Sequence, residues 1–186
     1  MTELTPRAAR KRRKIMDEAA RVFATEGPLA MNDLVKKLEV SRATLYRYFP
    51  TREELVRSIA IESFEDTRIA VEGLFDDVLT HREAFERLFE ALIPLGHYHF
   101  LSREWGLMED EEVMALVDEQ NKQVLAMIEQ AQAAGELDAN TPSHWIARHF
   151  DSMVWIAWEA VYSGHVARRD IARLTFNTFW SGVGTS

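Results

Sequence analysis

The sequence contains no cysteine, so neither a disulfide framework nor thiol chemistry is available to it. It has no run of about 18 apolar residues that would span a membrane, and its basic N-terminus lacks the apolar segment of a signal peptide. Internal repeats and low-complexity segments are absent, and no segment has a convincing strand pattern. These absences predict a cytoplasmic, all-α protein. With 186 residues, 47% of them hydrophobic, the chain can bury one sizeable core or two modest ones.

Charge is unevenly distributed along the chain. Residues 1–50 carry 11 Lys and Arg against 6 Asp and Glu, a charge balance of +5. Since the net charge of the chain is −8, the remaining residues have a balance of −13. Such asymmetry is typical of a protein with one end that binds nucleic acid and another that is repelled by it. A protein that coats DNA without sequence preference would be basic throughout, so the net charge disfavours that class.

The most informative segment is 31–49, which has the pattern of two short helices joined by a tight turn. Ser41 is a suitable N-cap for a second helix that begins at Arg42. On that helix Leu45 and Phe49 lie four residues apart and can face inward, which leaves arginine, threonine and tyrosine side chains facing outward or sideways. These residue types bind base edges and phosphates in DNA, so the segment predicts a helix-turn-helix. The alternative is a surface hairpin of helices that is basic by chance.

The flanking patterns complete a domain. An amphipathic helix precedes the pair and stops at Gly27, and Thr51 with Glu54 forms a capping box for a fourth helix. With the stretches 19–27, 40–49 and 52–55, the region from Ala8 to about Leu55 resembles the N-terminal DNA-binding domain of the TetR family of bacterial transcriptional regulators. The resemblance covers about the first third of the chain.

The resemblance implies an N-terminal three-helix helix-turn-helix domain followed by a C-terminal helical ligand-binding and dimerisation domain. It further implies a repressor that binds a palindromic operator in double-stranded DNA as a dimer and is released by an apolar or aromatic small molecule. Transcriptional activation stays open, as does architectural DNA binding without an effector. An enzyme is disfavoured, because the sequence has no Gly-rich phosphate loop, no cysteine nucleophile and no H-E-x-x-H pattern.

One position departs from the family pattern. The family often has glycine in the turn where this chain has Glu39. A residue other than glycine costs on the order of 1 kcal/mol in a left-handed conformation. We therefore expect a turn that is either slightly strained or shaped differently.

Candidate DNA contacts lie in three places. A basic cluster at the start of the first helix is expected to bind phosphates or enter the minor groove, with a solubilising tail as the alternative. On the second helix of the pair, arginine can read guanine, and the methyl group of alanine can contact thymine. The resemblance assigns phosphate contacts to the tyrosines and to the basic residue that starts the fourth helix, although the tyrosines could equally be half-buried packing. The candidates are Arg10, Arg13, Lys14, Ser41, Arg42, Ala43, Thr44, Tyr46, Arg47, Tyr48 and Arg52.

The division expected from these patterns is a DNA-binding domain over 1–50 and a helical domain over 51–186, with a linking helix over about 51–77. Four further helical patterns follow. The first begins at His81, and the second runs from Val113 to near Gly135. The third opens at Thr141 as its cap with Pro142 at N1, and the last begins near Ala167. The last two helices are apolar around much of their circumference, which indicates burial on two sides. We therefore expect a homodimer through these two helices, with a large monomeric core as the alternative.

The second domain is rich in aromatic and methionine side chains, which line apolar ligand sites but more often form plain core. The ligand-binding candidates are Phe89, Ile93, His97, Tyr98, Leu101, Trp105, Met108, Met127, Phe150, Met153 and Trp155. The histidine spacings do not favour a metal site, and no cofactor is expected. The acidic run 109–112 is interpreted as a solvated helix start, or as a feature that attracts a cationic ligand.

Overall fold

The computed structural model describes residues 5–77, 80–96, 101 and 104–185. Within these residues it contains eight α-helices, short 3-10 segments and no named strand, apart from an isolated bridge between Leu137 and Gly184. The predicted all-α class is therefore confirmed. None of the helices in the described part of the chain is long and apolar enough to cross a bilayer.

The chain forms two compact units: Met1–Ser63 with His97–Val113, and Phe64–Gly96 with Met114–Ser186. These bounds differ from the division expected from sequence, because the segment before α6 returns to the first unit. Helices α4 (Arg52–Val71) and α6 (Glu111–Ala133) each contribute residues to both units.

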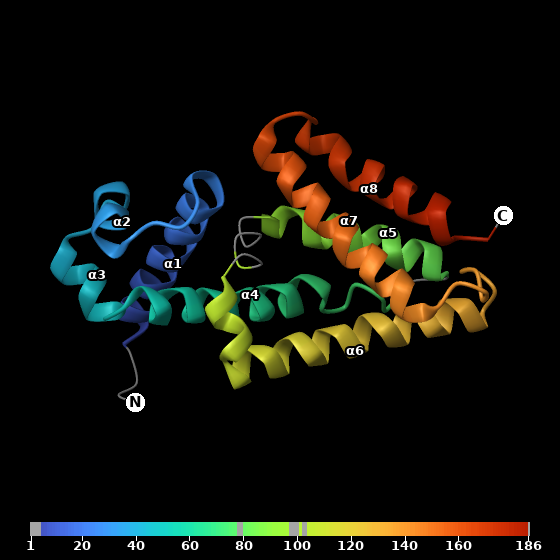
Figure 1. Ribbon diagram of the computed structural model, residues 1–186, viewed down its shortest axis with the longest axis horizontal. Helices are drawn as coiled ribbons and strands as arrows, with labels where there is room; N and C mark the ends of the chain where they lie inside the picture. The colour runs from blue at the N-terminus through green and yellow to red at the C-terminus, as the bar shows by residue number, and fades with distance from the viewer. Residues whose placement is uncertain (1–4, 78–79, 97–100, 102–103, 186) are drawn as a thin grey trace. The chain divides into compact units, whose positions relative to one another are not determined.

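The first unit contains α1 (Pro6–Glu26), α2 (Met31–Lys37), α3 (Arg42–Tyr48), the start of α4 and the 3-10 helix η2 (Trp105–Glu109) (Figure 1). Gly27 ends α1 with φ of 81°, a conformation that glycine adopts at little cost. The apolar stripes of α1 to α4 meet in a core that is almost fully excluded from solvent. Its members include Ile15, Ala19, Phe23, Leu34, Leu38, Leu45, Phe49, Leu55 and Ile59.

The turn between α2 and α3 is shaped differently rather than strained. Leu38 has φ of −82° and ψ of 136°, and the Val40 N–H donates to the Leu38 carbonyl oxygen at 2.7 Å. Across the described residues, positive φ occurs only at glycines. Glu39 therefore avoids the left-handed conformation, and the departure from the family pattern carries no backbone penalty of that kind.

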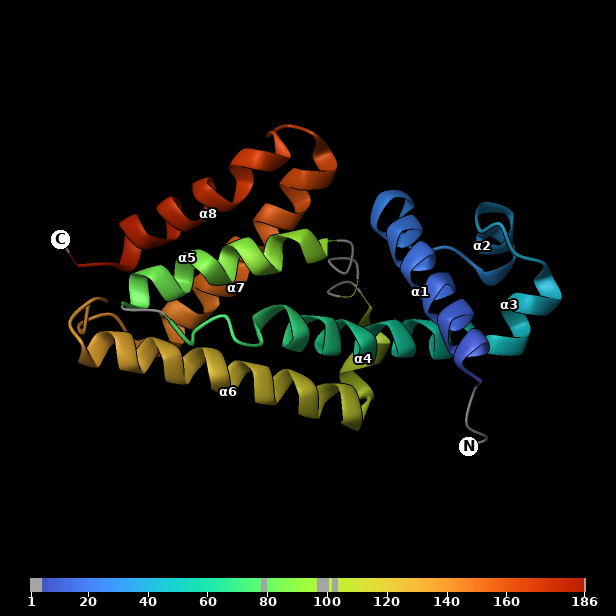
Figure 2. The ribbon, with the colours of Figure 1, turned by 180° about the vertical axis from the view of Figure 1, so that it is seen from behind.

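The second unit contains α5 (His81–Leu92), α7 (Ser143–Ser163) and α8 (Arg168–Val183), with the ends of α4 and α6. Helix α8 packs against both α5 and α7, as Figure 2 shows from behind. Aromatic rings fill the centre: the Phe85 ring lies 5.2 Å from that of Phe179, and the Phe89 ring lies 5.0 Å from that of Phe150. The Trp158 indole N–H donates to the Leu92 carbonyl oxygen at 3.0 Å, which ties α7 to the end of α5.

Two helix boundaries differ from the sequence prediction. Helix α4 ends at Val71 instead of near residue 77, because a turn with Gly73 at φ of 68° follows it. Pro142 is the N-cap of α7 and not its first residue, and no side chain caps that helix. The predicted start at Thr141 was therefore wrong by one position, and the Thr141 hydroxyl donates instead to Asp138 at 2.8 Å.

The N-terminus of α5 is held by a carboxylate that is distant in sequence. Glu136 accepts hydrogen bonds from the His81 backbone N–H at 3.1 Å, the His81 ring Nδ1 at 2.8 Å and the Arg82 N–H at 3.0 Å. Burial alone would raise the pKa of Glu136, but these hydrogen bonds outweigh it and keep the pKa below its ordinary value of 4.5. Since the folded pKa is depressed, this stabilisation is complete above about pH 4.5 and is lost as the pH falls further.

Glu136→Gln is expected to lower the melting temperature at pH 7 by about 2–4 °C, the effect of losing about 1 kcal/mol of helix capping in a chain of this size. The difference from wild type should be constant from pH 7 down to about 4.5 and shrink as the pH falls further, because protonation of the wild-type carboxylate then removes its advantage over the amide. Thermal melts followed by circular dichroism from pH 7 to about 3.5 measure both effects. A difference that stays constant over this whole range would contradict the capping role.

Candidate nucleic-acid interface and ligand cavity

Helix α3 presents a basic face that its capping and packing define. Ser41 caps the helix, since its Oγ accepts the Thr44 backbone N–H at 3.2 Å. Leu45 and Phe49 are buried, so the remaining side chains turn outward. The side chains of Ser41, Arg42, Ala43 and Arg47 are exposed, and those of Thr44, Tyr46 and Tyr48 are half-buried.

The two tyrosines support the two arginines of this face. The Arg42 guanidinium carbon lies 5.3 Å from the centre of the Tyr46 ring, and that of Arg47 lies 5.0 Å from the Tyr48 ring. The Tyr46 hydroxyl donates to Asn32 at 3.3 Å, which links α3 to α2. Cation–π contacts of this kind restrict the orientation of the guanidinium groups while leaving their N–H donors available.

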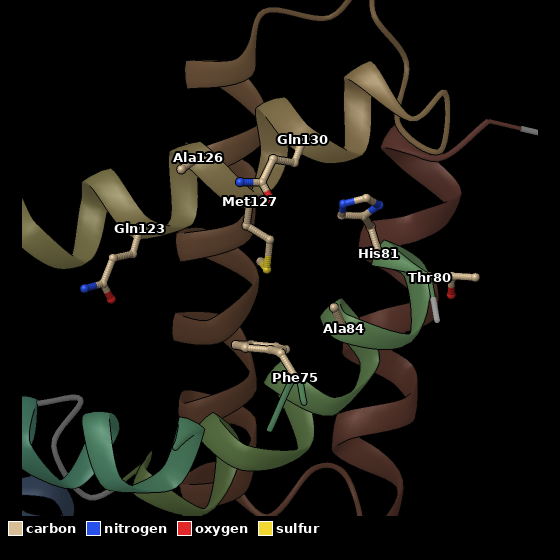
Figure 3. A pocket seen from close by; sticks show the side chains of 8 residues that line it. All are labelled: Phe75, Thr80, His81, Ala84, Gln123, Ala126, Met127 and Gln130. Carbon is tan, nitrogen blue, oxygen red and sulfur yellow. The ribbon is translucent and has the colours of Figure 1, made fainter. Parts of the chain in front are cut away.

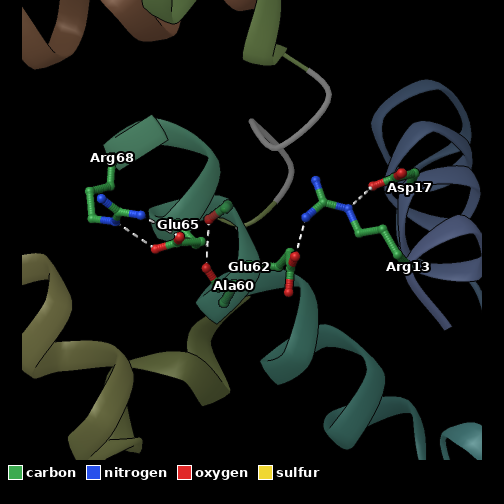
Figure 4. A network of polar contacts seen from close by, with 7 residues as sticks. Arg13, Asp17, Ala60, Glu62, Glu65 and Arg68 are labelled. Atoms are coloured by element: carbon green, nitrogen blue, oxygen red, sulfur yellow. Dashed lines mark hydrogen bonds and ion pairs between the residues drawn. The ribbon is translucent and has the colours of Figure 1, made fainter. Parts of the chain in front are cut away.

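The basic cluster of α1 divides into exposed and engaged residues. Arg10 and Lys14 are exposed, although Lys14 lies 3.5 Å from Glu18. Arg13 donates to Asp17 at 2.9 Å and to Glu62 of α4, as Figure 4 shows. Arg13 therefore holds α1 against α4 in this structure. Its distant partner on α4 could not be foreseen from the local sequence.

Arg52, the first residue of α4, is also engaged within the first unit. Its Nε donates to the Leu29 carbonyl oxygen at 3.1 Å, and its two terminal nitrogens donate to Glu104 at 3.0 and 2.5 Å. A second contact follows one turn later, where Arg57 donates to Asp110 at 2.6 Å and to Glu112. The backbone N–H of Val113 and then Arg57 hold the pKa of Asp110 below its ordinary value.

The acidic run 109–112 is therefore a helix start with a specific ion pair, and only partly solvated. Asp110 accepts the backbone N–H groups of Glu112 at 3.1 Å and Val113 at 3.0 Å at the N-terminus of α6. Among the described residues no group of three His, Cys, Asp or Glu side chains is arranged to hold a metal ion.

The second unit contains a cavity of about 510 Å³ between α5 and α6 (Figure 3). In Figure 3 the side chains of Met127 and Phe75 extend into this space. A smaller hollow of about 90 Å³ shares Phe75, Gln123 and Met127 with it. The two spaces are lined by Thr67, Val71, Phe75, Thr80, His81, Ala84, Leu88, Leu92, Gln120, Gln123, Val124, Ala126, Met127, Gln130 and Phe150.

Two predicted ligand residues, Met127 and Phe150, line these spaces. The other candidates that the structure describes lie elsewhere. Phe89, Ile93 and Met153 are buried in the core, Trp155 is half-buried on α7, and Leu101 and Met108 belong to the first unit, where Met108 is 61% exposed. Trp105 begins η2, and His97 and Tyr98 lie outside the described residues.

Sequence reasoning missed most of the cavity wall. One signal was present: α6 carries Gln120, Gln123, Met127 and Gln130 at helical spacing, a face that is polar but uncharged. Neutral amides next to apolar side chains are a combination that is typical of small-molecule sites, because the amides can orient a largely apolar ligand.

A third surface lies on α7 and α8. Trp145 is 68% exposed and Ile156 is 51% exposed on α7, and Leu174 of α8 is 42% exposed. Large apolar side chains that are exposed on adjacent helices are a common feature of protein interfaces.

Known proteins of similar sequence also have a helix-turn-helix, as this chain has in α2 and α3. Residues 15–59 match the family described as bacterial regulatory proteins, tetR family. The chain is 27% identical over 177 residues to the HTH-type transcriptional repressor LfrR of Mycolicibacterium smegmatis, covering 95% of this chain and 92% of LfrR. A further relative, an HTH-type transcriptional regulator of Mycobacterium tuberculosis, is 48% identical over 44 residues, 23% of this chain and 22% of that protein.

Solved structures give the same fold. The crystal structure of LfrR from Mycobacterium smegmatis in complex with proflavine has a TM-score of 0.77 at 26% identity and covers 96% of this chain and 99% of that one. The ketosteroid transcriptional regulator KstR2 of Mycobacterium tuberculosis has a TM-score of 0.79 at 14% identity, over 95% and 96% of the two chains. Residues 15–59 therefore match the DNA-binding domain of the TetR family, and the chain as a whole has the fold of TetR-like transcriptional regulators, which are not enzymes.

Proposed function

We propose that this regulator is a dimeric repressor that binds an inverted-repeat operator through α3 and releases it when an aromatic small molecule enters the cavity of the second unit. The observation that carries the proposal is the exposed Arg42 and Arg47 pair on a capped helix whose opposite side is buried. LfrR, which is similar along nearly the whole chain, is named a repressor. Such a protein would work in the cytoplasm, where bacterial DNA lies.

Sequence reading is assigned to α3 and DNA-backbone contact to the exposed residues around it. Arg42 and Arg47 can each bind guanine through two hydrogen bonds, and Ala43 offers a methyl group to thymine. Ser41, Thr44 and the tyrosine hydroxyls can reach phosphates, as can Arg10 and Lys14. We assign Arg13 to phosphate contact only where DNA displaces its carboxylate partners.

Dimerisation is assigned to the apolar face of α7 and α8. Burial of Trp145, Ile156 and Leu174 between two copies would remove apolar surface from water, which favours association by about 25 cal/mol per Å² before the costs of binding. In a dimer the two copies of α3 can read half-sites about 34–36 Å apart, one turn of DNA.

The cavity between α5 and α6 is assigned to the effector. Its volume of about 510 Å³ falls within the range of about 300–1,000 Å³ that is common for small-molecule sites. Phe75 and Met127 provide faces for a flat ring, and Gln123 and Gln130 provide hydrogen-bonding groups. LfrR was solved with proflavine, a flat aromatic molecule, so proflavine is the first probe. A 100-fold loss of operator affinity would need about 2.7 kcal/mol of coupling between the sites.

Ala126→Trp should close this cavity. Ala126 lines the cavity but is itself exposed, so an indole can enter the space without displacing the core. We expect proflavine binding to DNA-free protein to weaken at least about tenfold, a loss of about 1.4 kcal/mol. Quenching of proflavine fluorescence measures the affinity.

The matched control is Ala115→Trp, because Ala115 is exposed on the same helix but does not line the cavity. It should leave proflavine affinity unchanged. If both variants weaken proflavine binding equally, or if neither variant weakens it, the ligand binds elsewhere.

The experiment that tests the proposed function is selection of bound sequences from genomic DNA fragments by the purified protein at near-physiological salt. Enrichment of a short inverted repeat is the expected result. Enrichment that follows only A·T content would instead favour an architectural protein, because such a protein senses groove shape without reading base edges.

A further inference from the structure

The guanidinium group of Arg52 is fully engaged within the first unit. Its Nε donates to the Leu29 carbonyl oxygen at 3.1 Å, and its two terminal nitrogens bind the two oxygens of Glu104 at 3.0 and 2.5 Å. Phe23 supports it from one side, with its ring centre 5.4 Å from the guanidinium carbon. The side chains of Arg52 and Glu104 are only 23% and 15% exposed. This pair is therefore better shielded from solvent than an ordinary surface ion pair.

The position of Arg52 in the fold gives this pair its significance. Arg52 begins α4, four residues after Tyr48 ends the basic helix α3, and the two are joined through the exposed residues Pro50 and Thr51. The N-terminus of a helix carries partial positive charge and attracts phosphate. Glu104 binds Arg52 through both carboxylate oxygens, which is the geometry in which a phosphate also binds a guanidinium group.

A second ion pair holds the acidic segment in position independently of Arg52. Arg57 donates to Asp110 at 2.6 Å and to Glu112, one turn of α4 beyond Arg52. A hollow of about 360 Å³ lies between α4 and the acidic segment, lined by Arg52, Arg57, Glu104, Gly106 and Leu107 among others. This space lies next to both ion pairs, and Asp110 has its own partner in Arg57, so release of Glu104 from Arg52 would not require Asp110 to leave Arg57.

We infer that Glu104 is an internal phosphate mimic, which competes with the DNA backbone for Arg52 and lowers operator affinity. The inference rests on the proposed function, because it requires the α3 side of the first unit to bind DNA. DNA binding then exchanges one partner of Arg52 for another, and the segment 104–112 sets how readily that exchange occurs.

Glu104→Gln tests this competition. An uncharged amide binds arginine more weakly than a carboxylate does, so we expect operator affinity to rise about threefold to tenfold. Arg52 would also become a full phosphate contact, so the slope of log affinity against log salt should steepen by up to about 0.9 between about 50 and 200 mM salt. Fluorescence anisotropy with a labelled operator duplex measures both quantities, and thermal melts confirm that each variant is folded.

Two controls separate competition from general charge effects. Glu53→Gln removes the same charge one residue beyond Arg52 on an exposed side chain, and it should not reproduce the gain. In an Arg52→Ala background, Glu104→Gln should have no effect, because the contested group is gone. An equal gain from Glu53→Gln, or a gain that persists without Arg52, would overturn the inference.

The remaining outcomes are equally decisive. Weaker operator binding by Glu104→Gln would show that the pair builds the DNA-binding surface and does not restrain it. If the wild type binds the operator specifically and Glu104→Gln binds it with the same affinity, the competition would be overturned but the proposed function would stand. Absence of sequence-specific binding by the wild type would overturn both.

Discussion

Replacing Arg42 and Arg47 together with alanine is expected to remove most sequence-specific DNA binding. Both side chains are exposed on α3 and supported by a tyrosine ring, so the change leaves the core and the helix cap in place. Each bidentate contact to a base contributes about 1–3 kcal/mol, so the pair should cost about 2–6 kcal/mol, or about 30-fold to 2 × 10⁴-fold in operator affinity. Anisotropy titration against the selected operator and a scrambled duplex measures the loss.

The matched control removes two arginines from the second unit. Arg168 and Arg169 are exposed at the start of α8, and their replacement by alanine changes the net charge equally. We expect at most a small, salt-dependent change from this control. If the α3 variant binds the operator as tightly as wild type, the recognition surface lies elsewhere.

The second large effect is expected from Ile156→Glu on the exposed face of α7. The substitution places a charge in the surface that we assign to dimerisation, where burial without a partner is costly. We expect the protein to become monomeric and to lose at least about 100-fold in operator affinity, because a monomer gains nothing from the second half-site. Sedimentation equilibrium gives the mass, and anisotropy gives the affinity.

Ile69→Glu is the control for this change. Ile69 is 55% exposed on α4, close to the 51% of Ile156, but it lies outside α7 and α8. It should remain dimeric and bind the operator normally. A dimeric Ile156→Glu protein would show that these two helices do not form the interface.

Features that depend on neighbouring residues could be predicted from the sequence. The Ser41 cap, the Thr51 cap and the end of α1 at Gly27 each involve groups within four positions of one another. Helical periodicity likewise identified the buried side of α3, because Leu45 and Phe49 lie one turn apart. These local signals explain why the fold class and the basic face agree with expectation.

Features that depend on distant segments could not be predicted in the same way. Arg52 and Glu104 are separated by 52 positions, and nothing local to either residue indicates the other. The cavity wall takes residues from α4 to α7, so the aromatic content of the chain could not separate Phe89 in the core from Phe75 at the cavity. Met108 shows the same difficulty: it is apolar yet exposed on η2.

The most direct test of the central claim is the dependence of operator affinity on the distance between half-sites. A dimer that holds two α3 helices one DNA turn apart should lose most of its affinity when about five base pairs, half a turn, are inserted between the half-sites. Insertion of a full turn should be tolerated better, because it returns both half-sites to the same face of the duplex. Anisotropy titration of the three duplexes gives the comparison. Equal affinity for all three would contradict a dimer that reads an inverted repeat.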